Sequence, residues 1–137
     1  MKKIYFAGSI RGGRADAALY ARLIAHMQQR HTVLTEHVGS PALTPTVERG
    51  MTDEEIYEKD MAWLRESDVV IAECTTPSLG VGYELAYAEA HDKPVHVFYD
   101  PARCILSAML TGNPRFRIHP YDSEDALLAI IDSVLED

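Results

Sequence analysis

Apolar residues divide the chain into short runs and longer periodic stretches that alternate. Runs typical of β-strands occur at 3–7, 32–37, 68–73, 94–99 and 116–121. Apolar residues recur every three or four positions between them, which predicts helices over about 15–29, 52–66, 81–91, 105–110 and 123–135. The run Val-Val-Ile-Ala at 69–72 is typical of a central strand covered on both faces. This order predicts an α/β fold: a doubly wound, five-stranded parallel sheet flanked by helices, Rossmann-like or flavodoxin-like.

Two helix starts carry recognisable capping signals. Thr52 precedes Glu55 by three residues, which is the spacing of a capping box. Asp122 or Ser123 is expected to cap the last helix. Residues 38–51 contain Gly, Ser and Pro without periodicity and predict a functional or mobile loop.

Length and charge narrow the class of protein. The 137 residues are enough for one domain, so we expect residues 1–137 to fold as a single unit. A net charge of −8 argues against broad binding to nucleic acid or to acidic membranes. Cys74 and Cys104 are too few for a zinc knuckle or a disulfide framework. With no signal-peptide pattern and no apolar run of membrane-spanning length, we expect a cytoplasmic protein.

Two Gly/Ser loops follow predicted strands. Gly8–Arg14 follows the first strand, and Thr76–Glu84 joins the third strand to the helix at 81–91. In a doubly wound sheet, ligands bind beyond the carboxyl ends of the strands, where both loops fall. The backbone N–H groups at a helix start favour an anion. We therefore expect a phosphate-bearing substrate with a carboxylate beside it.

The first loop is not a dinucleotide fingerprint, because its glycines do not give G-x-G-x-x-G and no Walker lysine is present. Its chemistry predicts a short phosphate cradle made of the Ser9 hydroxyl, nearby N–H groups and an arginine fork, in a loop that carries Arg11 and Arg14. The alternative is an ordinary Gly-rich turn with solvent-exposed arginines.

Two carboxylates are candidates for chemistry. Asp60 lies four residues from both Ile56 and Leu64, on the apolar stripe of its helix. A carboxylate there is costly unless it is paired or functional, or unless it reaches water at the edge of the stripe. Glu84 is expected in the first turn of its helix, where an acid can also simply complement the helix dipole.

Further polar residues are expected at the same sheet edge. Glu36 and Glu73 end strands there, whereas Asp68 is expected to start its strand at the opposite edge. His37 either touches a ligand or is an ordinary loop histidine. The histidines have no metal-ligand spacing, so no metal site is expected.

Five blocks of the sequence, in order, closely resemble the 2'-deoxynucleoside 5'-phosphate N-hydrolases of the nucleoside 2-deoxyribosyltransferase superfamily. The blocks are Ile4–Arg14, Leu34–Val38, Asp60–Leu64, Pro77–Leu85 and Leu106–Met109. The resemblance covers nearly the whole chain, and several ordered blocks are far more specific than a single motif.

This resemblance implies a role for each of three residues. Glu84 looks like the nucleophile that attacks the sugar C1' and forms a glycosyl-enzyme ester. Asp60 looks like its partner, which orients the sugar and helps to protonate the departing base. This is the two-carboxylate logic of retaining glycoside cleavage. Tyr5 resembles the tyrosine beside the sugar C2', where its hydroxyl would crowd a ribose 2'-OH.

The resemblance also implies the substrate-binding residues. The residues that it implies as 5'-phosphate ligands are Ser9, Arg11, Gly12, Ser78 and Gly80. Gly8, Ile10 and His37 are the further substrate-binding positions. Ser107 and Met109 match positions that reach the neighbouring subunit's site, which implies a homodimer with shared active sites. No metal or organic cofactor is implied.

The implied reaction is hydrolysis of the N-glycosidic bond of a 2'-deoxynucleoside 5'-monophosphate to free nucleobase and 2-deoxyribose 5-phosphate. Three alternatives stay open: a nucleoside 2-deoxyribosyltransferase, a ribonucleotide N-glycosidase of the kind that acts on CMP, and a non-catalytic nucleotide-binding sensor. The pair Asp60 and Glu84 argues against the sensor, and the phosphate cradle argues against the transferase.

Overall fold

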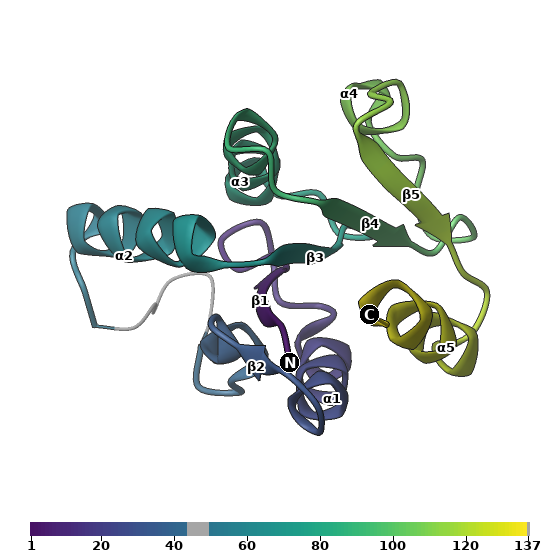
Figure 1. Cartoon of the computed structure of the whole chain (residues 1–137), viewed down its shortest axis with the longest axis horizontal. Coiled ribbons are helices and arrows are strands. Elements are labelled where there is room, and N and C mark those ends of the chain that lie inside the picture. The colour runs from purple at the N-terminus through teal and green to yellow at the C-terminus, as the bar shows by residue number, and fades with distance from the viewer. Residues whose placement is uncertain (44–49, 137) are drawn as a thin grey trace.

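A parallel five-stranded sheet lies between two layers of helices in the computed structural model, which describes residues 1–43 and 50–136 (Figure 1). The strand order is β2-β1-β3-β4-β5, and every pair is parallel. The elements are β1 (Lys3–Ala7), α1 (Ala17–Gln28), β2 (Thr32–Val33), the 3-10 helix η1 (Glu36–Gly39), α2 (Asp53–Glu66), β3 (Val69–Glu73), α3 (Leu79–Ala90), β4 (Val95–Tyr99), α4 (Ala108–Thr111), β5 (Phe116–Pro120) and α5 (Glu124–Leu135). The predicted fold class is confirmed, with the flavodoxin-like strand order.

The direction of winding reverses between β1 and β3. From β1 the chain first moves outward to β2, then returns to place β3 on the other side of β1. The loops after these two strands therefore diverge above the sheet and leave a crevice at their carboxyl ends, where ligands bind in this class of fold.

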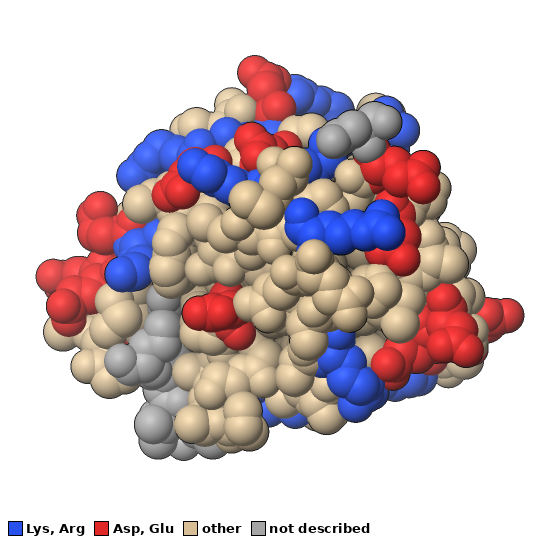
Figure 2. All heavy atoms as spheres, turned by 60° about the horizontal axis from the view of Figure 1, so that its bottom comes forward, with Lys and Arg blue, Asp and Glu red and all other residues tan. Residues whose placement is uncertain are grey.

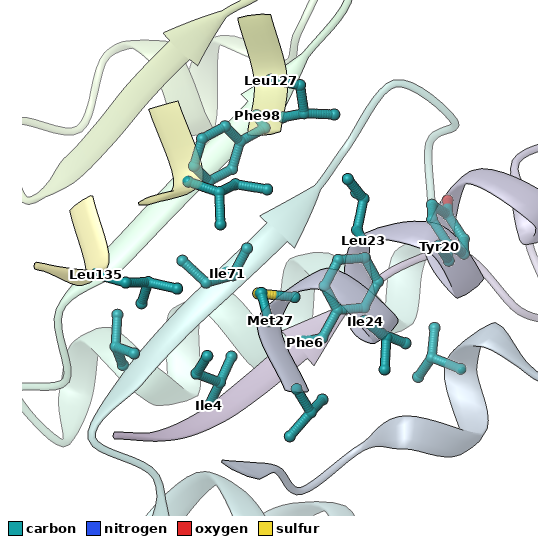
Figure 3. Packing of buried hydrophobic residues seen from close by; sticks show 14 of the residues in the cluster. Ile4, Phe6, Tyr20, Leu23, Ile24, Met27, Ile71, Phe98, Leu127 and Leu135 are labelled. Atoms are coloured by element: carbon teal, nitrogen blue, oxygen red, sulfur yellow. The ribbon is translucent and has the colours of Figure 1, made fainter. Parts of the chain in front are cut away.

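Strand β1 divides its side chains between the two core layers. Ile4 and Phe6 pack with α1 and α5, in the cluster drawn in Figure 3. Tyr5 and Ala7 point to the opposite face and pack beneath α2 and α3. This alternation follows from the two-residue period of a strand, and it places Tyr5 on the face of the sheet that carries the acidic residues of α2 and α3.

Strand β2 is shorter than the sequence predicts. The expected strand at 32–37 ends at Val33, and Glu36 already belongs to η1. Thr35 explains the change, because its Oγ1 accepts from Phe6 N at 2.9 Å and donates to Phe6 O at 2.7 Å. One side-chain hydroxyl thus replaces the next step of the backbone ladder, and the chain turns away from β1.

Helix α3 begins two residues earlier than predicted. Ser78 is its N-cap residue, and the Ser78 Oγ accepts from Val81 N at 3.3 Å. Gly80 and Gly82 therefore lie within the helix instead of flanking a turn. Glu84 lies in the second turn, not the first, so it is too far from the helix start for a simple dipole role.

The remaining boundaries follow the sequence closely. Thr52 and Glu55 form the expected capping box, and Ser123 caps α5. Helix α4 is shorter than expected, because Ser107 caps it and no helix forms before Ala108. The central part of the predicted loop at 38–51, residues 44–49, lies outside the described residues.

Charged side chains of both signs are interspersed on the face shown in Figure 2, and the described part of this face presents no continuous basic surface. Several charged side chains of the protein are paired, as in the contact at 2.8 Å between Arg22 of α1 and Glu124 of α5. Within residues 1–43 and 50–136, every helix is too short or too polar to cross a membrane.

Candidate active site

A cavity of about 530 Å³ opens at the carboxyl ends of β1 and β3, below α2 and α3. It lies at the point where the winding of the sheet reverses. The predicted site residues that line it are Tyr5, Gly8, Ile10, Arg11, Gly12, His37, Asp60, Ser78, Gly80 and Glu84. Segments far apart in the sequence are thus brought together around one space.

Tyr5 and Glu84 are in direct contact inside this cavity. The Tyr5 hydroxyl donates a hydrogen bond to Glu84 Oε2. The ring of Tyr5 is held in the core beneath α2 and α3, so the position of its hydroxyl is fixed. Burial raises the pKa of Glu84 to about 8. The carboxyl group thus changes its charge close to neutral pH, which is a common property of groups in active sites.

Asp60 reaches the same cavity from α2. The residues of this helix that line the cavity are Asp53, Ile56, Tyr57, Asp60 and Met61, which form one helical stripe. The apolar stripe seen in the sequence therefore points to the cavity over this stretch, and Asp60 is its half-buried polar member. The site has two carboxylates, one from each helix that covers this face of the sheet.

The loop at residues 8–14 is packed tightly against the start of α3. A Cβ atom at Gly12 would lie 2.5 Å from the Pro77 carbonyl oxygen and 2.8 Å from Ser9 Oγ, so only glycine permits this approach. Ser9 is completely buried behind the cavity, and among the described residues its Oγ has no hydrogen-bond partner. A buried hydroxyl without a partner is unusual, which makes it a candidate for a bond to a ligand.

The two arginines of this loop have different roles. Arg11 lines the cavity and is half-exposed, with its Nη2 2.7 Å from Asp53 Oδ1. This contact holds the pKa of the Asp53 carboxyl below its usual range. Arg14 instead donates to the carbonyl oxygens of Ser9, Ser40 and Leu43, at 3.1 Å each. Arg14 therefore braces the backbone, and of these two arginines it is Arg11 that lines the cavity.

The start of α3 forms the other side of the cavity. A helix leaves its first N–H groups without intrahelical partners, and Leu79 and Gly80 both line the cavity. A Cβ at Gly80 would have only Ser78 Oγ within 4 Å, at 3.9 Å, so packing within the chain does not require glycine here. The absent side chain leaves space in the cavity beside donors that suit an anion.

Two tyrosines at the cavity were not predicted as site residues. Tyr57 of α2 and Tyr83 of α3 line it, and their hydroxyl oxygens lie 3.3 Å apart. Both are about half-exposed. Their positions in the sequence could have indicated a place at the cavity, because Tyr57 precedes Asp60 by one helical turn and Tyr83 adjoins Glu84. His37 is supported from behind by stacking on Trp63, with ring centroids 5.5 Å apart.

Other candidate carboxylates lie away from the cavity. Glu73 is buried within the fold, where it accepts hydrogen bonds from Thr75 and Tyr121, and burial raises its pKa. Glu36 is exposed and accepts from Gln28. Asp68 lies at the opposite edge, as expected, and accepts from Lys3 N at 2.8 Å.

Ser107 and Met109 do not line the cavity of their own chain. Ser107 caps α4, and Met109 is 80% exposed. Within the described ranges, no three His, Cys, Asp or Glu side chains are grouped as metal ligands.

The fold and the cavity define a doubly wound α/β protein with two carboxylates, Asp60 and Glu84, lining a cavity at the point where the winding reverses. The model of the nucleoside 2-deoxyribosyltransferase family matches residues 4–128. The 5-hydroxymethyl-dUMP N-hydrolase of Mus musculus is 47% identical over 127 residues, which cover 89% of this chain and 73% of that protein. The protein of the same name from Tetraodon nigroviridis is 47% identical over 140 residues, which cover 98% of this chain and 95% of that protein. The chain therefore belongs to the nucleoside 2-deoxyribosyltransferase family.

The fold is also shared with a solved structure of low sequence identity. The Clostridium botulinum CMP N-glycosidase superposes with a TM-score of 0.70 at 18% identity, over 96% of this chain and 99% of that chain. At this identity the likeness concerns the fold alone.

Proposed function

We propose that this protein hydrolyses the N-glycosidic bond of 2'-deoxynucleoside 5'-monophosphates, releasing the nucleobase and 2-deoxyribose 5-phosphate. The observation that carries the proposal is the contact between Tyr5 and Glu84, in a cavity that also contains Asp60 and ends at the loop of Ser9 and Gly12. The names of the two relatives, both hydrolases of a deoxynucleoside monophosphate, support the same reaction.

In the proposed first step, a carboxylate oxygen of Glu84 forms a bond to the sugar C1' as the bond from C1' to the base nitrogen breaks. The electron pair leaves with the base, and Asp60 provides a proton to it. In the second step, water attacks C1' and Glu84 leaves, while the ionised Asp60 takes the proton from the water. This sequence regenerates both carboxyl groups and follows the pattern of retaining glycosidases.

Tyr5 has two proposed tasks. Its hydroxyl donates to Glu84, and this bond favours the charged form that the nucleophile needs. The same hydroxyl is proposed to lie beside C2' of the sugar. A ribose 2'-OH would then compete for the space that the phenol occupies, which favours a deoxyribose.

The proposed cradle for the 5'-phosphate has two sides. One side is the loop from Gly8 to Gly12, with the unpartnered Ser9 hydroxyl, Ile10 and the Arg11 guanidinium. The other side is the start of α3 at Ser78 and Gly80. Helix-start N–H groups and an arginine suit a phosphate through charge-assisted hydrogen bonds.

The base is proposed to lie toward His37, Tyr57 and Tyr83, which bring aromatic rings to the cavity. Aromatic side chains provide large flat contact surfaces for a nucleobase. Because both curated relatives are named for 5-hydroxymethyl-dUMP, this nucleotide is the first substrate to test.

A homodimer is part of the proposal. Large apolar side chains of α3 and of the segment around α4 face solvent: Leu79 is 97% exposed, Ile105 98% and Met109 80%. Such exposure is typical of an interface with another chain. A second copy would cover these side chains and bring Ser107 and Met109 to the neighbouring site. The free cysteines Cys74 and Cys104 support a reducing, cytoplasmic setting.

The experiment is a panel of nucleoside 5'-monophosphates, deoxy and ribo, together with the matching unphosphorylated deoxynucleosides, with base release followed by chromatography. We expect release from the deoxynucleoside monophosphates above all. Equal cleavage of phosphorylated and unphosphorylated deoxynucleosides would contradict the proposal. Adding a second base as acceptor separates transfer from hydrolysis, because a transferase would form a new nucleoside.

A further inference from the structure

Asp16 occupies the N-cap position of α1 but does not cap this helix. Aspartate is among the preferred N-cap residues, yet its side chain makes no capping hydrogen bond here. Both carboxylate oxygens are instead used across the fold. Arg103 Nη1 lies 2.9 Å from Oδ1, and Arg103 Nη2 lies 3.3 Å from Oδ2. Thr76 Oγ1 donates to the same Oδ2 at 3.0 Å.

These contacts join three segments at the carboxyl edge of the sheet. Asp16 follows the loop at residues 8–14, Thr76 lies two residues before Ser78, and Arg103 ends the turn after β4. The first two segments form the two sides of the proposed phosphate cradle. Asp16 therefore links one side of the cradle directly to the other.

The cradle depends on the spacing between its two sides. The tight contact of Gly12 with Pro77 and Ser9 leaves no room for a shift toward closer packing. Movement in the other direction is opposed by the bond between Asp16 and Thr76. The packing thus prevents a closer approach and the hydrogen bond opposes a wider one, so together they define the distance between the loop at residues 8–14 and the start of α3.

Arg103 is itself held in place from the sheet side. Its backbone N donates to Asp100 O at 3.0 Å, and Asp100 N donates to Thr75 Oγ1 at 3.0 Å. Thr75 Oγ1 in turn donates to the buried Glu73 at 2.6 Å. The guanidinium therefore approaches Asp16 from an anchored turn, in the paired geometry that is strongest for an arginine and a carboxylate.

Asp16 is only 8% exposed, so its carboxylate has little contact with water and is paired with Arg103 instead. Without Arg103, a nearly buried carboxylate would lose its counter-ion and would move toward water or change its contacts. Thr76 would then lose a fixed acceptor, and the start of α3 would no longer be held against the loop of Ser9.

We propose that the ion pair of Asp16 and Arg103 is a positioning element that fixes the two sides of the phosphate cradle and thereby sets the affinity for the 5'-phosphate. The inference rests on the proposed function, because it assigns a task to residues that support that site without touching the substrate.

The test compares Arg103→Ala with the control Arg22→Ala. Arg22 also binds a carboxylate through two nitrogens, with Nε 2.9 Å from Glu124 Oε2 and Nη2 2.8 Å from Glu124 Oε1, but it joins α1 to α5 away from the cavity. For each variant, KM and kcat are measured with the best deoxynucleoside monophosphate. Inhibition by 2-deoxyribose 5-phosphate and by inorganic phosphate is measured in parallel.

For Arg103→Ala we expect KM and both inhibition constants to rise by about tenfold, with kcat within about twofold of the wild type. The reason is that the variant weakens binding of the phosphate group and leaves the rate of the chemical step almost unchanged. Arg103→Lys should recover part of the loss, since it keeps the charge but not the paired geometry. Arg22→Ala should leave all three constants unchanged.

Two further variants change the same contacts by smaller substitutions, in case Arg103→Ala does not fold. Thr76→Val removes only the hydroxyl and Asp16→Asn only the charge, and each should weaken phosphate inhibition in a protein that melts cooperatively. A folded Arg103→Ala protein with unchanged phosphate inhibition would overturn the inference, and so would unchanged inhibition in both further variants. If the wild type itself shows no preference for phosphorylated substrates, the proposed function fails, which is a separate result.

Discussion

The hydroxyl of Tyr5 donates a hydrogen bond to the carboxylate of Glu84, and this contact joins the interior strand β1 to helix α3. The two residues are 79 positions apart in the sequence. Tyr5 is fixed by the core, whereas Glu84 faces the cavity. The contact thus gives the acidic group a fixed orientation toward the cavity.

The first prediction concerns the nucleophile. Glu84→Gln should lower kcat by several orders of magnitude, because a covalent nucleophile cannot be replaced by a neutral amide. Binding of the substrate should persist, as measured by calorimetry with the deoxynucleoside monophosphate. A variant with near-normal turnover would remove Glu84 from the mechanism.

The second prediction concerns pH. In the proposed mechanism Glu84 reacts in its ionised form, and burial raises the pKa of this carboxyl to about 8. Ionisation requires loss of a proton, so kcat/KM should rise with pH through a midpoint near 8, for as long as Asp60 keeps the proton that it gives to the base. Tyr5→Phe removes the donor to the carboxylate and should move the midpoint to higher pH. A profile with the same midpoint in both proteins would contradict this assignment.

The third prediction separates the two arginines of the loop. Arg11→Ala should weaken binding of the monophosphate by about 1.5–3 kcal/mol, the scale of a hydrogen bond to a charged group. Arg14→Ala should mainly lower the melting temperature, because it breaks three bonds to backbone carbonyl oxygens. Titration calorimetry and thermal unfolding of both variants provide the comparison, and equal losses of affinity in the two variants would contradict this division of roles.

The fourth prediction concerns the sugar. Tyr5→Phe should raise activity on ribonucleoside monophosphates relative to deoxynucleoside monophosphates, since it removes the hydroxyl proposed to face C2'. A change of one hydroxyl in a site is worth about 1–3 kcal/mol, so the preference should move without being abolished. The ratio of kcat/KM for each matched ribo and deoxy pair is the measurement. An unchanged ratio would leave Tyr5 with its bond to Glu84 as its only role in the site.

The fifth prediction concerns assembly. If Ser107 completes the neighbouring site across a two-fold axis, an inactive Glu84→Gln chain and an inactive Ser107→Glu chain should complement each other when co-expressed. Random pairing would leave about one site in four competent, namely the site with Glu84 from one chain and Ser107 from the other. Mixed protein as inactive as its parents, or a monomer by light scattering, would refute the shared site.

Much of the fold could be predicted because its signals are local. The apolar runs of β1, β3 and β4 and the capping box at Thr52 follow from neighbouring residues alone. The early end of β2 could not be predicted, because it depends on a bond from Thr35 to Phe6, 29 residues away. The start of α3 was placed too late because Gly80 and Gly82 are weak helix formers.

The residues of the site also divide into those that the local sequence indicates and those whose roles depend on contacts formed only in the folded chain. Asp60 and Glu84 are candidates from their places on the expected helices, but their roles come from the resemblance to the family, because either carboxylate could also simply face water or complement a helix dipole. Arg14 lies in the same loop as Arg11, and the sequence alone does not give it a different role, because its three carbonyl partners become adjacent only in the folded chain. Tyr57 and Tyr83 were missed because a tyrosine at helical spacing is equally typical of a core.

The short edge strand β2 has a consequence for how copies of this protein meet. A long exposed edge would allow another strand to pair with it, which is a common route to aggregation. Here β2 offers only Thr32 and Val33 before the chain turns into η1, and at the other edge β5 carries Arg117 and ends at Pro120, which has no N–H to donate. Growth of the sheet from molecule to molecule is therefore disfavoured at both edges. The proposed homodimer would accordingly use the exposed side chains of the helices and not the strand edges.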